Sequence, residues 1–297
     1  MATRAGFVTV AGRPNAGKST LLNRLVGQRL AITSPKPQST RERVVGIVSD
    51  VDTQMVLLDT PGLLEPSCAL QRSMRAASLR ALEDADVIVH LIDALEGHVE
   101  PLAVAAGLGT DRTLRAPTLL VLNKADALSA ARRAALAMEH EDTLVISART
   151  GEGVPDLLAR VRAMLPKGPF LYDPEDVSSQ HLRFFAAEMV RETALEQLED
   201  EVPYSVACEI EEYRETRSPV YIRAVLHVER ESQKRILIGS GGSRIKSIGT
   251  AARRKIEALV GAAVFLDLHV KVLPNWRRNA AALQRLGYKV PPGDDDA

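Results

Sequence analysis

The residues best suited to chemistry lie in the stretch GRPNAGKST, between Gly12 and Thr20. Gly12, Gly17, Lys18 and Ser19 have the spacing of a loop that wraps a phosphate group. The backbone N–H groups of such a loop point inward, its lysine reaches the β- and γ-phosphates, and its serine hydroxyl can bind Mg²⁺. An apolar run before this stretch and a helical pattern after it argue against a chance glycine turn. The predicted phosphate-binding residues are Gly12, Arg13, Pro14, Asn15, Ala16, Gly17, Lys18, Ser19 and Thr20.

A second polar group follows the apolar run 55–58 and extends the predicted phosphate site. It comprises Asp59, Thr60, Pro61, Gly62 and Leu63. The aspartate can orient Mg²⁺ through water, and the N–H of Gly62 can meet an oxygen of a γ-phosphate. Most isolated DxxG sequences are turns, but the position one strand after a phosphate loop favours the site. Leucine at 63 cannot orient an attacking water as glutamine could, so we expect slow intrinsic hydrolysis.

The loop over 35–41 is a candidate sensor of the γ-phosphate, because a threonine there could bind Mg²⁺ only when the triphosphate is present. Thr40 is preferred over Ser39, Ser34 and Thr33. With Lys18, Asp59, Gly62 and Asn15, Thr40 completes the predicted catalytic set. Two interpretations of Asn15 stay open. It either supports the loop turn, or its oxygen joins loop carbonyls in holding a monovalent cation that replaces a catalytic arginine.

The base of the nucleotide is indicated by Asn123, Lys124 and Asp126. Guanine presents N1–H and N2–H₂ side by side, and the carboxylate of Asp126 can accept from both. Adenine would leave that carboxylate unpaired, which a buried site rejects strongly. Ser147 and Ala148 would add a backbone N–H toward guanine O6. The alternative is a strand-to-helix turn with Asp126 as the helix N-cap.

The elements around these groups alternate between apolar runs and helical patterns. This alternation is typical of a mostly parallel sheet with helices on both faces. Ligands bind such sheets at the carboxyl ends of the strands, so we expect the four polar groups to converge on one site. The predicted strands are 7–10, 44–48, 55–58, 87–92, 118–122 and 143–146, with helices after Ser19, through Leu82, after Asp126 and over 154–165.

Three prolines and a glycine within 166–174 predict a linker, and the pattern changes beyond it. A helix is expected over 179–200, strands over 204–213 and 220–228, a short helix to 238, a helix over 243–259 and a strand over 263–273. The predicted organisation is an α/β domain at 1–166, a linker at 167–178, an α+β domain at 179–290 and a disordered acidic tail at 291–297.

The loop Gly239-Ser240-Gly241-Gly242 between two helices resembles the backbone clamp of a KH domain, which grips about four nucleotides of a single strand. Eight Lys and Arg residues and one acid lie between 230 and 256, which makes a local basic patch. The predicted RNA-binding residues are the four clamp residues with Lys234, Arg235, Arg244, Lys246 and Arg253. Trp276 to Arg278 either extends this surface or forms a packed cap.

Bulk composition sets limits on the class of protein. The 297 residues leave room for about two domains, and the net charge of zero means that attraction to nucleic acid must be local. Two distant cysteines favour a reducing compartment, and the six scattered histidines have no metal-ligand spacing. No apolar run reaches the roughly 18 residues of a membrane span, which leaves peripheral membrane contact open.

Several motifs recur together in an order that resembles the Era family of bacterial GTPases. They are GRPNAGKSTLLN, QSTR, DTPGL, NKAD, SAR, PYSV, ILIGSGGSRIKSIG and LGY, and they cover nearly the full length. The resemblance implies a P-loop GTPase domain followed by a type II KH domain, with Mg²⁺ as cofactor and Thr40 as its sensing ligand. Ser39 and Gly241 depart from the family, which more often has threonine and a basic residue there.

The resemblance further implies a cytoplasmic, monomeric switch, partly peripheral at the inner membrane, that binds GTP and GDP. It would bind the 3′ end region of 16S rRNA and assist maturation of the 30S subunit. Relatives that share Asn15 are potassium-stimulated, which favours K⁺ as a second ion. The rival hypothesis is a constitutive RNA-binding protein or chaperone with a structural nucleotide site. Nothing in the sequence supports a division or membrane-signalling GTPase.

Overall fold

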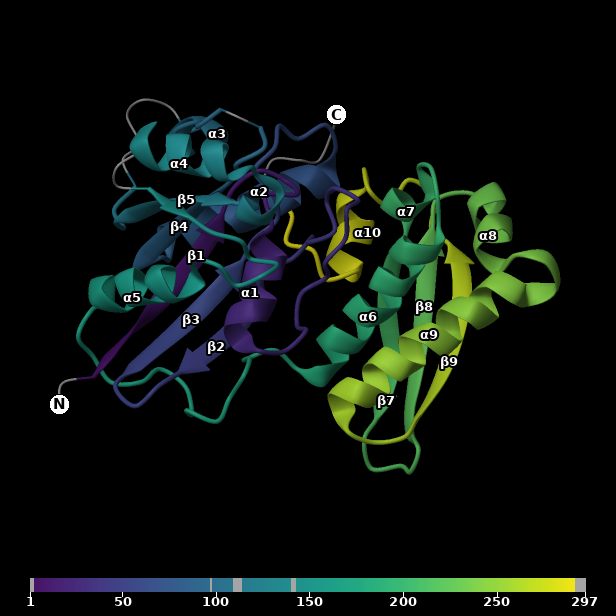
Figure 1. The fold of residues 1–297 in the computed structure, drawn as a ribbon. Coiled ribbons are helices and arrows are strands. Elements are labelled where there is room, and N and C mark those ends of the chain that lie inside the picture. The colour runs from purple at the N-terminus through teal and green to yellow at the C-terminus, as the bar shows by residue number, and fades with distance from the viewer. Residues whose placement is uncertain (1–2, 97, 109–113, 140–142, 292–297) are drawn as a thin grey trace. The chain divides into compact units, whose positions relative to one another are not determined.

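The computed structural model describes residues 3–96, 98–108, 114–139 and 143–291 (Figure 1). The chain divides into two compact units, the first formed by residues up to 66 and by 74–179, and the second by 67–73 and the residues from 180 onward. Of the predicted acidic tail at 291–297, all but Pro291 lies outside the described residues. In the part of the chain that is described, no helix is long and apolar enough to cross a bilayer.

The first unit is built on a six-stranded sheet with the strand order β2-β3-β1-β4-β5-β6. Its ladders are parallel except for the antiparallel pair β2 and β3. Every residue of β3 is buried, as expected for a strand covered on both faces. The predicted α/β fold is therefore confirmed. The strands are β1 (Arg4–Ala11), β2 (Val44–Ser49), β3 (Thr53–Asp59), β4 (Val87–Asp93), β5 (Thr118–Asn123) and β6 (Leu144–Val145).

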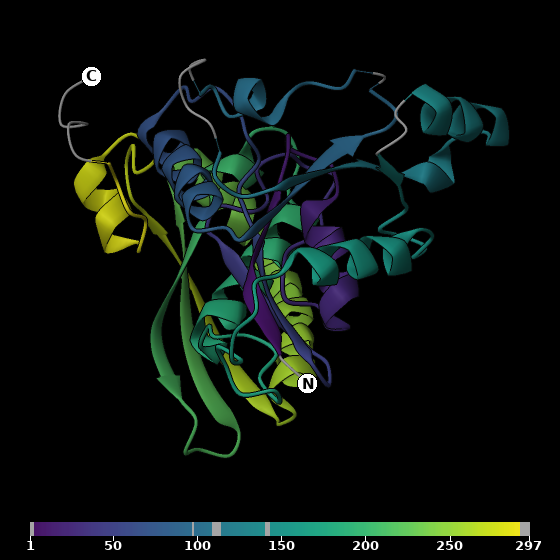
Figure 2. The ribbon, with the colours of Figure 1, turned by 90° about the vertical axis from the view of Figure 1, so that its left-hand side faces the viewer.

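Helices cover both faces of this sheet. Figure 2 shows α1 and α5 on one side of the strands and α2 on the other. Leu21 and Leu22 of α1 are fully buried, and Leu82 of α2 packs against Ile88 of β4. These contacts fix the strand ends from which the polar loops emerge. The helices are α1 (Lys18–Val26), α2 (Ala69–Glu83), α3 (Leu102–Ala105), η1 (Ala125–Ala127), α4 (Ala130–Glu139) and α5 (Val154–Met164).

The segment 167–178, expected to be a linker, runs along the first unit and is hydrogen-bonded to it. The side-chain oxygen of Gln54 accepts from the backbone N–H groups of Leu171 and Tyr172 at 2.7 and 2.9 Å. The N–H of Ile47 on β2 donates to the carbonyl of Val177 at 2.9 Å. Prolines and irregular backbone therefore do not make this stretch a free tether, because a buried glutamine satisfies its donors.

The second unit has a three-stranded sheet of order β7-β8-β9, with β7 antiparallel and β9 parallel to β8. Helices α6 and α9 pack on one face over a core that includes Val190, Leu226 and Ile256. The predicted strand at 204–213 begins instead at Ala207, because Val202–Ser205 forms a short helix with Pro203 in its first turn. The elements are α6 (Leu182–Gln197), α7 (Val202–Ser205), β7 (Ala207–Arg214), β8 (Val220–Val228), α8 (Glu231–Ile238), η2 (Ser240–Gly242), α9 (Ser243–Val260), β9 (Val264–Val272) and α10 (Ala280–Arg285).

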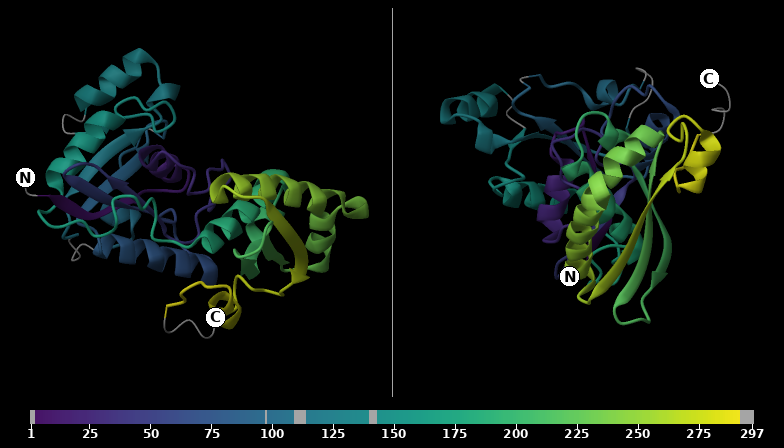
Figure 3. Two further views of the ribbon diagram at one scale, coloured as in Figure 1. Left: turned by 90° about the horizontal axis from the view of Figure 1, so that it is seen from below. Right: turned by 90° about the vertical axis from the view of Figure 1, so that its right-hand side faces the viewer.

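The chain after β9 crosses to the other face of this second sheet, where α10 lies opposite α9 (Figure 3, right). Trp276 is fully buried, donates from its indole N–H to the carbonyl of Ser205 at 2.9 Å and stacks on Tyr288. Of the two interpretations of Trp276, the packed cap is the one that its burial supports. Val225 and His227 point away from α6 and α9, yet they are also buried. One end of this face is thus covered by the chain's own C-terminal segment.

Candidate nucleotide-binding and RNA-binding sites

The strand ends of the first unit surround a cavity of about 630 Å³. It lies where β1, β3 and β5 deliver their polar loops, as the strand-end argument predicts. The residues around it include Asn15, Lys18, Ser19, Thr40, Gly62, Lys124 and Arg149.

Lys18 is buried beneath the phosphate loop. Its ammonium donates to the carbonyls of Gly12 and Arg13 at 3.2 and 2.8 Å. Burial lowers the pKa of Lys18 to about 8, and the charge of Asp59 opposes this shift. Because burial removes water from around the ammonium of Lys18, its charge is poorly compensated, and phosphate oxygens would bind to it favourably.

Ser19, Thr40 and Asp59 meet at one point although they come from three segments. The Ser19 hydroxyl donates to Asp59 Oδ2 at 2.7 Å, and the Thr40 hydroxyl lies 3.2 Å from the same oxygen and 3.0 Å from that of Ser19. Burial raises the pKa of Asp59, although Lys18 and the two hydroxyls oppose this. Asp59 Oδ1 is buried and has no hydrogen-bond partner in the described chain. Two hydroxyls beside an unsatisfied carboxylate oxygen form an all-oxygen set that suits Mg²⁺.

The Asp59–Leu63 segment is held tightly against the phosphate loop. A Cβ added to Gly62 would lie 2.6 Å from the backbone nitrogen of Pro14, so only glycine fits. Thr60 donates its hydroxyl to the carbonyl of Val10, and Pro61 accepts from the hydroxyl of Ser78. Leu63 donates its N–H to Gly12, and its side chain is buried in the core. These contacts give Thr60, Pro61 and Leu63 structural partners within the protein.

Asn123 joins three of the predicted motifs. Its side-chain nitrogen donates to the carbonyl of Ala16 at 2.8 Å, and its oxygen accepts from the N–H of Ala148 at 2.8 Å. Both polar atoms are thereby used, so Asn123 positions the phosphate loop and the 147–149 loop relative to each other. Lys124 adopts a left-handed backbone and pairs with Asp93 at 2.5 Å.

The carboxylate of Asp126, the group predicted to recognise the base, is held by two side chains. Asp126 lies in η1 without acting as an N-cap, accepts from the Ser147 hydroxyl at 2.5 Å, and pairs with Arg149 at 2.5 Å. The Ser147 hydrogen bond, and next the charge of Arg149, hold the pKa of Asp126 below its ordinary value. The carboxylate is therefore ionised at neutral pH and ready to accept two hydrogen bonds.

Three residues of this site were not predicted from the sequence. Asp93, Arg149 and Arg24 each fix a guanine-site loop, and Arg24 does so by donating to the carbonyls of Ala148 and Arg149. Asp93 had a usable signal, because it ends a strand as Asp59 and Asn123 do. Arg24 had none, since its partners are backbone carbonyls 124 residues or more away.

Arg13 and Asn15 occupy the outer side of the phosphate loop. Arg13 is exposed and pairs with Glu100 at 2.9 Å. Asn15 has a positive φ of 62°, which asparagine tolerates, and its side-chain nitrogen donates to the carbonyl of Pro35 at 3.1 Å. Asn15 therefore bridges the phosphate loop to the loop that carries Thr40.

In the second unit, the GSGG loop turns tightly between α8 and α9. Gly241 and Gly242 both have positive φ, and Arg244 donates to the carbonyl of Ile236 at 3.0 Å across the turn. Gly241 is exposed, and open space surrounds the position of an added Cβ. The absence of a basic side chain at Gly241 thus leaves the backbone of the loop accessible.

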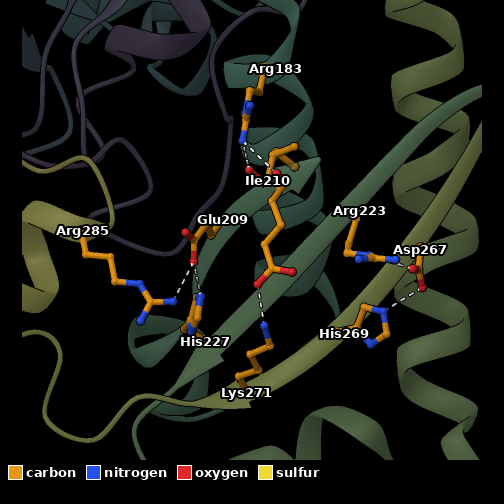
Figure 4. A network of polar contacts seen from close by, with 10 residues as sticks. Arg183, Glu209, Ile210, Arg223, His227, Asp267, His269, Lys271 and Arg285 are labelled. Atoms are coloured by element: carbon orange, nitrogen blue, oxygen red, sulfur yellow. Dashed lines mark hydrogen bonds and ion pairs between the residues drawn. The ribbon is translucent and has the colours of Figure 1, made fainter. Parts of the chain in front are cut away.

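The basic residues around this loop divide into two groups. Lys255 pairs with Glu192 and Glu196 of α6 and so serves packing. Seven others make no ion pair with any described residue, which leaves their charge for an external anion: Arg230, Lys234, Arg235, Arg244, Lys246, Arg253 and Arg254. On the opposite face of the sheet, by contrast, charges pair with one another across the strands (Figure 4). There Arg277, next to the buried tryptophan, pairs with Glu229.

Comparison with known proteins matches both units. Residues 7–124 match the family described as 50S ribosome-binding GTPase, and residues 201–277 match the KH domain. GTPase Era of Nostoc sp. is 40% identical, covering 97% of this chain and 90% of its own. GTPase Era of Thermotoga petrophila is 41% identical, covering 97% and 99%.

Two solved structures agree over the full length. One is a variant of Aquifex aeolicus Era bound to GDP and AlF4−, and the other is Era with MgGDPNP and nucleotides 1506–1542 of 16S ribosomal RNA. Each has a TM-score of 0.88 and 36% identity, and covers 97% of this chain and all of its own. With the phosphate, metal and guanine residues assembled as described, this chain belongs to the Era family and is a GTPase.

Proposed function

We propose that the protein is a GTP-operated switch that binds the 3′ end region of small-subunit rRNA and assists maturation of the 30S subunit. This proposal rests on one observation: the same chain contains an assembled GTPase site and a GSGG loop surrounded by basic residues that make no ion pair with any described residue. The relative seen with MgGDPNP and 16S rRNA nucleotides supports it.

The hydrolysis site works through charge placement. Lys18 would exchange its two carbonyl partners for phosphate oxygens, and the N–H of Gly62 would meet the γ-phosphate. Mg²⁺ would be held by the hydroxyls of Ser19 and Thr40 and, through water, by Asp59, and when bound it supplies positive charge beside the phosphates. Because Leu63 is buried and apolar, no side chain at that position orients water, and the unaided rate should be low.

A monovalent cation is the proposed substitute for a catalytic arginine. The side-chain nitrogen of Asn15 donates to the carbonyl of Pro35 at 3.1 Å, so turning the amide over would bring its oxygen beside a loop carbonyl next to the phosphate loop. A K⁺ ion on these oxygens would neutralise charge that develops during hydrolysis. It would also tie the Thr40 loop to the phosphate loop in the triphosphate state.

RNA binding is assigned to the GSGG loop and the unpaired basic residues of α8 and α9. Phosphates can approach the backbone closely at Gly241, where no side chain intervenes, while the N–H of Gly242 donates to the carbonyl of Gly239 at 3.2 Å and closes the loop. Exposed basic groups nearby supply the sequence-independent part of the affinity.

Equilibrium binding of a fluorescent oligonucleotide with the rRNA 3′-end sequence tests the proposal. Its affinity for the full-length protein is measured with a non-hydrolysable GTP analogue and with GDP, at fixed salt. We expect binding to be at least about fivefold tighter with the GTP analogue, the lower range of allosteric coupling. Asp59→Ala serves as a control that should lose the difference.

The rival hypothesis makes the opposite prediction. A constitutive RNA-binding protein or chaperone would bind the oligonucleotide equally with either nucleotide. No binding in either state would remove RNA from the function altogether. Depletion of the protein in cells, with accumulation of 16S precursor as the readout, then tests the role in 30S maturation separately.

A further inference from the structure

On the sheet face away from α6 and α9, three planar groups stand in a row across three strands. Arg214 on β7 is in register with Tyr221 on β8, which is in register with Phe265 on β9. The two rings are stacked, with centroids 5.8 Å apart and planes 12° from parallel. The guanidinium of Arg214 lies 5.7 Å from the Tyr221 centroid. We call this row of Arg214, Tyr221 and Phe265 the ring ladder.

The ring ladder ends on an exposed ring. Phe265 is 55% exposed and lies on β9, an edge strand, so no further strand continues the row. The other end of the same face, at Val225 and His227, is buried. Phe265 and Tyr221 therefore form a contiguous aromatic surface with one ring open to a stacking partner.

The central ring of the ladder, Tyr221, is held by a carboxylate. Asp267 accepts from the Tyr221 hydroxyl at 3.1 Å and from Arg223 at 3.2 Å, and it pairs with His269 at 2.9 Å, as Figure 4 shows for its two basic partners. The guanidinium of Arg223 is also within 5.9 Å of the Tyr221 centroid. A platform fixed in this way loses little side-chain entropy when a ligand stacks on it.

We propose that a nucleobase of single-stranded RNA stacks on Phe265 and continues the ring ladder, at a second RNA contact separate from the GSGG loop. The inference rests on the proposed RNA binding by this unit. Every base has a π-face, and aromatic rings that receive bases without sequence preference are common in single-strand binders. The 18 residues of α9, about 27 Å long, separate the GSGG loop from the turn that leads to Phe265.

The surrounding charges define how this contact differs from the basic patch. Arg214 pairs with Glu212 and Arg223 with Asp267, so the ring ladder carries no excess positive charge. Its contribution to RNA affinity therefore comes from stacking and should vary little with salt. Binding at the GSGG loop, in contrast, should weaken as salt rises.

The experiment uses the whole chain and two pyrimidine-rich RNAs. The short RNA, of about eight nucleotides, is long enough for the roughly four that the clamp holds. The long RNA, of about 20 nucleotides, can also reach Phe265. Phe265→Ala should weaken binding of the long RNA about tenfold and leave the short RNA unchanged. Phe265→Tyr should restore affinity because it keeps the ring. Val51→Ala is the control, because it removes an exposed apolar side chain in the first unit. It should leave the affinity for both RNAs unchanged.

Photocrosslinking of the long RNA carrying 5-iodouridine locates the contact directly, because this base crosslinks to a stacked aromatic ring. A crosslink to Phe265 or Tyr221 is the expected result. Crosslinks confined to the peptide around Gly239–Ser243, with wild-type affinity in Phe265→Ala, would overturn the second contact and leave the proposed function intact. If neither RNA bound the wild-type protein, both would fail.

Discussion

At the scale of the residue, we expect base specificity to depend on Asp126, because its carboxylate is fixed by Ser147 and Arg149. Asp126→Asn should shift preference from guanine to xanthine nucleotides, since an amide donor suits the C2 carbonyl of xanthine. We expect a loss of GDP affinity of about 10²-fold or more. Competition between GDP and XDP measures the change.

The matched control is Ser147→Ala, which removes the hydroxyl partner and keeps the carboxylate. This variant should lower the affinity for both GDP and XDP and should keep the preference for GDP. Strong GTP preference retained in folded Asp126→Asn would mean that another group reads the base.

Asn15 is the residue that tests the role of a monovalent cation. GTP hydrolysis by the wild type should be faster in KCl than in NaCl at equal ionic strength, and Asn15→Ala should lose this difference. Removing an electrostatic stabiliser of this kind costs about 10²-fold in rate where it has been measured in other enzymes. Steady-state phosphate release in the two salts is the readout, and equal wild-type rates would exclude the ion.

At the scale of elements, the turn between α8 and α9 allows the effect of charge on RNA binding to be separated from the effect of shape. Gly242 has a φ of 77°, but a Cβ there would meet only Ile245, at 3.9 Å. Gly242→Asp should therefore fold and lose RNA binding, because its carboxylate repels phosphate. Gly242→Asn has the same shape, tolerates the same φ and lacks the charge. Filter binding should rank wild type above Asn and Asn above Asp, with GTP affinity unchanged in all three.

Strand β4 carries a pH-sensitive group, His90, beside a cavity lined also by Arg13, Asp93 and Glu100. Burial lowers the pKa of His90 to about 4, and Glu100 opposes this shift. Because the unfolded chain takes up the proton near pH 6.5 and the folded chain only near 4, stability must fall as pH drops through this window. The loss attributable to His90 is about 3 kcal/mol at most.

Urea unfolding of wild type and His90→Gln at several pH values between 4 and 7 checks this expectation. The free energy of unfolding should depend less on pH in the variant. Parallel pH profiles for the two proteins would assign the acid sensitivity to other groups.

At the scale of the whole molecule, the sequence predicted most of what strand geometry determines. The polar groups after β1, β3 and β5 had to converge once these strands were parallel. Ser19 meets Asp59 at 2.7 Å, and Asn123 donates to the carbonyl of Ala16 in the phosphate loop at 2.8 Å. The features that the sequence did not predict are those that depend on contacts with distant segments. The short helix α10 and the contacts of Arg24 exist only because distant segments pack or supply carbonyls.

The covered end of the second sheet has a spectroscopic consequence. Trp276 is the single tryptophan of the chain, and it is buried in the second unit. Intrinsic fluorescence excited at the indole band therefore reports on that unit alone, while circular dichroism averages over both. Tryptophan emission should be blue-shifted in the native protein and move to longer wavelength only when the C-terminal segment leaves Ser205. A melting curve followed by fluorescence therefore records the unfolding of the second unit, and one followed by circular dichroism records the unfolding of both units.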